Sequence, residues 1–74
     1  MKKLLRLINK YIAHHDIMPS VIFLGGEKKK CQVVFDGKHD LDDMGFTIDK
    51  YTALHTWYYK WDSESDQTTI VFQK

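Results

Sequence analysis

The first fifteen residues place apolar and polar side chains with the period of an α-helix. At 100° per residue, the apolar positions fall within an arc of about 160°; they are Leu4, Leu5, Leu7, Ile8, Tyr11, Ile12 and His15. The stretch contains no Gly or Pro, whereas Pro19 follows soon after it. The pattern predicts an amphipathic N-terminal helix that ends before residues 16–20.

Two short runs of strand-forming residues come next, at residues 21–24 and 31–35. Between them lie Gly25-Gly26 and a lysine-rich tract, an order typical of a β-hairpin with a basic tip. Alternation along the second run favours one face as the core side, because its side chains are the more apolar. These side chains are Cys31, Val33 and Phe35.

The middle of the chain is polar, and its secondary structure is harder to predict. Residues 36–45 are expected to form an acidic loop, and residues 46–49 to begin another strand. Residues 51–61 allow two interpretations, because Ile48, Tyr51, Leu54 and Tyr58 loosely fit helical spacing. Residues 56–59, however, all prefer strands, and residues 68–72 make a natural partner. We therefore favour a second hairpin.

Within that hairpin, successive side chains point to opposite faces of the sheet. The more apolar set should face the helix: Tyr51, Ala53, His55, Trp57, Tyr59, Trp61, Ile70 and Phe72. The other set should stay open to solvent: Thr52, Leu54, Thr56, Tyr58, Lys60, Thr69 and Val71. Ile22 or Val34 from the first hairpin would lie on the same open face. The predicted fold class is α+β, an N-terminal amphipathic helix on one face of a mainly antiparallel sheet of about four strands, forming a single domain over residues 1–74.

Composition limits the size of the core and the class of protein. A chain of 74 residues buries only about 60% of its unfolded surface, so the core must be thin. Cys31 is the only cysteine, which argues against a disulfide-stabilised secreted domain. No apolar run approaches the roughly 20 residues that cross a bilayer, and polar residues interrupt the N-terminal stretch where a signal peptide would be apolar. We expect a cytoplasmic protein.

Charge is distributed unevenly, although the net charge is only +1. Residues 1–30 hold seven basic and two acidic side chains, and residues 31–74 hold four basic and eight acidic ones. The basic group would form a nucleic-acid surface: Lys2, Lys3, Arg6, Lys10, Lys28, Lys29 and Lys30. Against this, the isoelectric point of 7.9 lies below the value above about 9 that is usual for nucleic-acid-binding domains.

Metal and catalytic chemistry have weaker support. The acidic loop is rich in oxygen ligands, namely Asp36, Asp40, Asp42 and Asp43 with His39, but Met44 and Tyr51 occupy places where a calcium loop needs oxygen. The four histidines and Cys31 lack zinc spacing. Cys31 is expected to be buried, and Ser20, Ser63 and Ser65 lie in no nucleophile motif. We therefore expect no cofactor and no enzymatic activity.

Protein binding is the function that the pattern favours. We expect a small non-catalytic module of the accessory or inhibitor type, with another protein as the most favoured partner and a second copy of the chain as an alternative occupant. A nucleic-acid module and a metal-binding loop remain the other hypotheses. The predicted contacts lie on the open sheet face and in the acidic loop: Leu54, Thr56, Tyr58, Lys60, Val71, Asp36, Asp40, Asp42 and Asp43.

Overall fold

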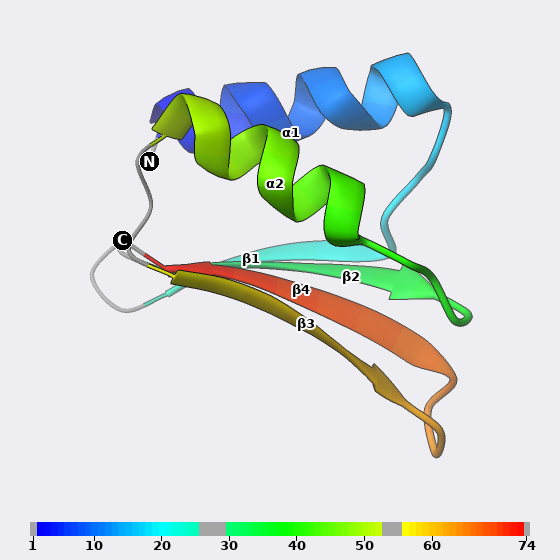
Figure 1. Ribbon diagram of the computed structural model, residues 1–74. Helices are drawn as coiled ribbons and strands as arrows, with labels where there is room; N and C mark the ends of the chain where they lie inside the picture. Colours follow the sequence, from blue (N-terminus) through cyan, green and yellow to red (C-terminus); the bar gives the residue numbers. More distant parts are fainter. Residues whose placement is uncertain (1, 26–29, 53–55, 74) are drawn as a thin grey trace.

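Two helices lie on one face of a four-stranded antiparallel sheet in the computed structural model (Figure 1). The structure describes residues 2–25, 30–52 and 56–73. In chain order the elements are α1 (Lys2–His15), β1 (Val21–Gly25), β2 (Lys30–Asp36), α2 (Asp42–Thr52), β3 (Thr56–Asp62) and β4 (Gln67–Gln73). This arrangement confirms the predicted α+β class, the N-terminal helix and both hairpins.

The sheet order is β1-β2-β4-β3, so the two hairpins meet through their second strands. Both β2 and β3 are antiparallel to β4 and therefore run parallel to each other. Helix α2 connects them, and β4 lies between them, which makes β2-α2-β3 a split βαβ unit. The edge strands of the sheet are β1 and β3.

Helix α1 has the boundaries that its apolar pattern predicts. Leu4 and Ile8 are buried against the sheet, and the lysine-rich side is exposed. The helix ends at His15, and the next residue, Asp16, has a φ of 52°, the left-handed conformation that Asp tolerates better than most residues. Among the described residues, no helix combines the length and apolar character needed to span a membrane.

Helix α2 corrects two predictions. Residues 42–45 were expected in a loop and residues 46–49 in a strand, but all belong to this helix. Leu41, Met44 and Ile48 recur at helical spacing and are buried, so burial of this stripe favours a helix over a strand. Asp42 and Asp43 stand in the first turn, where carboxylates interact favourably with the helix dipole.

The core lies between the helices and the sheet. It contains the predicted Cys31, Val33 and Phe35 together with residues from both helices and β4: Leu4, Ile8, Leu41, Met44, Ile48, Ile70 and Phe72. Trp57 and Tyr59 pack against it and are half-buried.

Three residues of the predicted second hairpin are placed differently. Tyr51 and Thr52 belong to α2 rather than to a strand, so their predicted faces are wrong. Trp61 is on the predicted face but exposed, and its Nε1 donates to Asp66 Oδ1 at 3.3 Å. Ala53, Leu54 and His55 lie outside the described residues.

Candidate functional site

The face of the sheet turned away from the helices is the main candidate surface, called here the open face (Figure 1). No part of the chain within residues 2–25, 30–52 and 56–73 covers it. Strand alternation and register define its members. They are Val21, Phe23 and Gly25 from β1, Lys30, Gln32, Val34 and Asp36 from β2, Thr56, Tyr58, Lys60 and Asp62 from β3, and Gln67, Thr69, Val71 and Gln73 from β4.

An apolar band crosses the open face from one edge strand to the other. Phe23 pairs with Gln32, Gln32 with Val71, and Val71 with Tyr58, which places these four side chains in one row. The two aromatic rings at the ends are 54% and 51% exposed, whereas Val71 between them is only 4% exposed. Val71 therefore forms the floor of the band, and the rings of Phe23 and Tyr58 are the parts a partner would meet.

Charges on the open face are balanced and separated along the strands. Lys30 stands at the end where β2 begins, and Lys60 lies beside the apolar band. Asp36 and Asp62 flank Gln67 at the other end. Side-chain hydrogen bonds, first from Gln67 and then from Ser20, lower the pKa of Asp36. Within the described strands, the face therefore offers two lysines and two carboxylates around an apolar centre.

No family model, curated protein or solved structure matches this chain. The open face must therefore be interpreted from the chemistry of its own residues.

Some of the residues predicted to contact a partner through the sheet do lie on the open face. Thr56, Tyr58 and Lys60 are exposed there, and Val71 is on the same face but buried. Leu54 lies outside the described residues. Of the two alternatives from the first hairpin, Val34 is on the open face and Ile22 packs against the core instead.

Two members of the open face, Val21 and Phe23, were missed as contacts. The run at residues 21–24 is apolar at every position, so composition does not tell its two faces apart. The faces are assigned by pairing with the next strand, β2, which has one clearly apolar side. Leu24 stands opposite Cys31 on the core side, so Val21 and Phe23 belong to the open face.

The predicted acidic loop is divided by the fold. Asp36 belongs to the open face, but Asp40, Asp42 and Asp43 are on the helix side of the sheet. Asp40 Oδ1 accepts hydrogen bonds from Asp42 N and from Tyr59 Oη, each at 3.1 Å. These carboxylates connect α2 to its neighbours, so the four aspartates do not form one binding loop.

The predicted basic surface is divided as well. Lys3, Arg6 and Lys10 are exposed on α1, in the helix layer, whereas Lys30 belongs to the opposite side of the sheet. The side chain of Lys2 and residues Lys28 and Lys29 lie outside what the structure describes. The described lysines and arginine therefore do not make one continuous phosphate-binding surface.

Two of the candidate metal or nucleophile residues, His39 and Cys31, make contacts within the fold. In the described ranges, no three His, Cys, Asp or Glu side chains are grouped so that they could hold a metal ion. His39 Nε2 is 2.7 Å from the carbonyl oxygen of Asp36, and its ring packs near Phe35. Burial raises the pKa of the Cys31 thiol to about 11, so the thiol is protonated and a poor nucleophile at neutral pH.

Tyr11 connects the two helices and should make stability depend on alkaline pH. Its Oη donates to Asp43 Oδ2 at 2.6 Å. Desolvation, followed by this hydrogen bond and the Asp43 charge, raises the Tyr11 pKa to about 12. Because folding favours the protonated phenol, its contribution is present below about pH 10, the unfolded value, and is lost as the pH rises through 12.

We expect the stability of the wild type relative to Tyr11→Phe to fall between pH 10 and 12. Urea unfolding of both proteins across this range measures the difference. Asp43→Ala should move the Tyr11 ionisation to lower pH, and an unchanged ionisation midpoint in that variant would contradict the assignment.

Proposed function

We propose that this chain is a small non-catalytic binding module of the accessory or inhibitor type, whose open face binds another protein. The observation that carries the proposal is the apolar band, with Phe23 and Tyr58 half-exposed on a sheet face that no described element covers. Exposed apolar side chains on an uncovered sheet face are a common feature of protein interaction sites. Aromatic side chains are also enriched among the residues that contribute most to protein interfaces.

The charge balance of the open face supports a protein over a nucleic acid. Phosphate binding needs an excess of cations, because affinity follows the number of neutralised phosphates. Here Lys30 and Lys60 are matched by Asp36 and Asp62. Exposed rings could also stack on bases, so nucleic acid is retained as an outcome of the test.

The acidic end of the open face fits a partner that presents basic side chains at the matching position. From the predicted acidic loop only Asp36 contributes to it, and Asp62 replaces the other aspartates. The single, buried thiol of Cys31 supports the cytoplasm as the compartment of this interaction.

Tyr58→Ala tests the proposal against a closely matched control. Tyr51 is 55% exposed, nearly the same as Tyr58, but belongs to α2 on the helix side. We expect Tyr58→Ala to weaken capture of the cellular partner at least about tenfold, the effect of a moderate hot spot. Tyr51→Ala should bind like the wild type. Quantitative affinity capture from the native cell, followed by calorimetry with the purified partner, measures both.

The salt dependence of binding distinguishes the class of partner. A protein held by the apolar band should bind with little change between low and moderate salt, whereas nucleic acid should be lost steeply. If Tyr51→Ala and Tyr58→Ala lose the partner equally, or if neither does while both remain folded, the open face is not the binding surface.

A further inference from the structure

Strand β1 is an edge strand without the usual protection against pairing. Its five residues, Val-Ile-Phe-Leu-Gly, include no charge and no proline. Edge strands expose a row of free backbone donors and acceptors, and proteins normally protect them with charged side chains, proline or a covering element. The other edge, β3, carries Lys60 and Asp62 and contacts α2. β1 is therefore the edge that is better suited to accept another strand.

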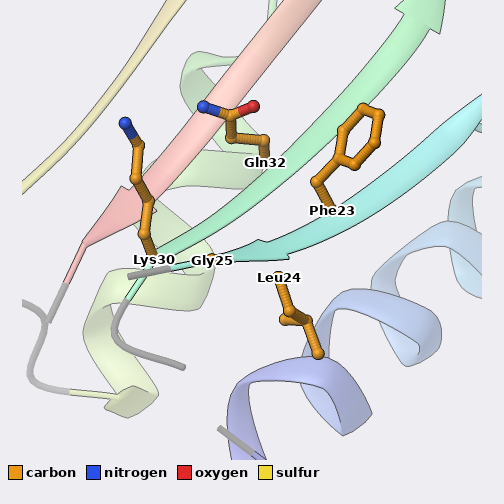
Figure 2. A pocket seen from close by; sticks show the side chains of 5 residues that line it. All are labelled: Phe23, Leu24, Gly25, Lys30 and Gln32. Carbon is orange, nitrogen blue, oxygen red and sulfur yellow. The ribbon is translucent and has the colours of Figure 1, made fainter. Parts of the chain in front are cut away.

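Apolar side chains are exposed on both sides of β1. In Figure 2, Leu24 points toward α1, whereas Phe23, Lys30 and Gln32 point to the open face. A hollow of about 270 Å³, lined by these residues and Gly25, follows the edge. Leu24 is 46% exposed, and a partner lying flat on the open face would leave it uncovered. A partner strand paired with the edge would place its own side chains beside these on both faces of the sheet.

Helix α1, toward which Leu24 points, also carries partly exposed apolar side chains. Tyr11 contacts Asp43, so the side of α1 that carries Tyr11 faces α2. On a helical wheel, Leu5 and Ile12 are on the opposite flank, about 100° or more away from Tyr11. Both are half-buried. A partner that extends the sheet beyond β1 and places a helix beside α1 would cover this flank as well.

We propose that the partner of the β1 edge is a second copy of this chain, paired through its own β1 in antiparallel register around a two-fold axis at Phe23. In this register Phe23 faces Phe23 of the second copy, Ile22 faces Leu24, and Val21 faces Gly25. Aromatic and aliphatic cross-strand pairs of this kind are favourable.

Two features of the strand favour its own copy over a foreign peptide. A two-fold contact requires a surface complementary to itself, and β1 satisfies this because no charge meets a like charge when the strand is reversed. Among the described residues, none has an atom within 4 Å of the place that a Cβ on Gly25 would occupy, which leaves room there for the Val21 side chain of the second copy.

Pairing of two β1 strands does not require the proposed protein partner of the open face, but it would enlarge the surface available to that partner. The two sheets would join into one of eight strands, because each contributes four. Phe23 of both copies would then connect the two apolar bands. The dimer would present a continuous open face of twice the width to the proposed protein partner.

Charge substitutions at Phe23 test the register directly. The wild type should show a mass that rises with concentration from monomer toward dimer in sedimentation velocity. Phe23→Glu and Phe23→Lys should each remain monomeric, because the two-fold axis places like charges opposite each other. An equimolar mixture of the two variants should recover the dimer. Phe23 is half-exposed, so both variants should fold, which circular dichroism verifies.

Tyr58→Glu and Tyr58→Lys are the matched control, since Tyr58 is in the same row but on the other edge strand. Alone or mixed, they should associate like the wild type. A wild type that stays monomeric up to about millimolar concentration overturns the proposal, and so does a dimer that persists in both Phe23 variants. Loss in both variants without recovery in the mixture also overturns the proposal, because the two Phe23 side chains would then not face each other across a two-fold axis. None of these results depends on partner capture through Tyr58.

Discussion

Gly45→Ala should destabilise the protein by about 2 kcal/mol, although Ala is the better helix former. A Cβ at Gly45 would lie far inside contact distance of three ring atoms of Trp57. Overpacking of this kind costs about 3 kcal/mol at the upper end of its usual range, and the helix propensity of Ala returns about 1 kcal/mol. The Trp57 ring must then move and give up its edge-on contact with Phe46, at 4.9 Å between centroids.

A double-mutant cycle with Trp57→Leu isolates the cause. In the Trp57→Leu background the ring is absent, so Gly45→Ala should be neutral or stabilising by up to about 1 kcal/mol. Urea unfolding followed by circular dichroism measures all four proteins. Equal destabilisation by Gly45→Ala in both backgrounds would show that the close approach of α2 to β3 is not the reason for the glycine.

Gly45 also explains why α2 was not predicted. Gly and Asp are weak helix formers, and residues 42–49 contain one glycine and three aspartates. The helical signal consists of Leu41, Met44 and Ile48, whose burial against the sheet outweighs local propensity. The glycine leaves space for the Trp57 ring, and no local sequence pattern shows such a contact.

The elements with strong periodicity were predictable. Helix α1 and strands β2 and β4 each have one clearly apolar side, and their core residues follow from that alternation. For β3, strand propensity correctly outweighed the looser helical spacing. Alternation along this strand also predicted the face of Trp61 but not its exposure. The Trp61 side chain is 38% exposed on the helix side of the sheet, and Lys38 Nζ lies 4.9 Å from its ring centroid.

The candidate site was only partly predictable, because it depends on which strands become neighbours. Tyr58 and Lys60 follow from alternation within β3. Phe23 joins them only because β4 and β2 stand between β3 and β1, which depends on the whole topology. For the same reason the four aspartates looked like one loop in the sequence, whereas the fold places Asp36 on the open face and the other three on the helix side of the sheet.

Thr68→Val should cost about 2 kcal/mol through the loss of one buried hydroxyl. Thr68 is completely buried in β4. Its Oγ1 donates to the carbonyl oxygen of Gly37 at 2.7 Å and accepts from the backbone N–H of His39 at 3.1 Å. Valine fills the same volume, but both backbone groups lose their partner, and each such group costs about 1–3 kcal/mol when water cannot replace it fully.

Thr69→Val is the matched control for this substitution. Thr69 is the next residue in β4, but its side chain is half-exposed on the open face. The substitution Thr69→Val should change the free energy of unfolding by less than about 0.5 kcal/mol, as for most surface positions. Hydrogen exchange should also report faster exchange at His39 in Thr68→Val alone, because the hydroxyl holds the β2–α2 connection against β4. Similar stability of the two variants would mean that this connection is held by the packing of Leu41 and Phe35 rather than by the hydroxyl of Thr68.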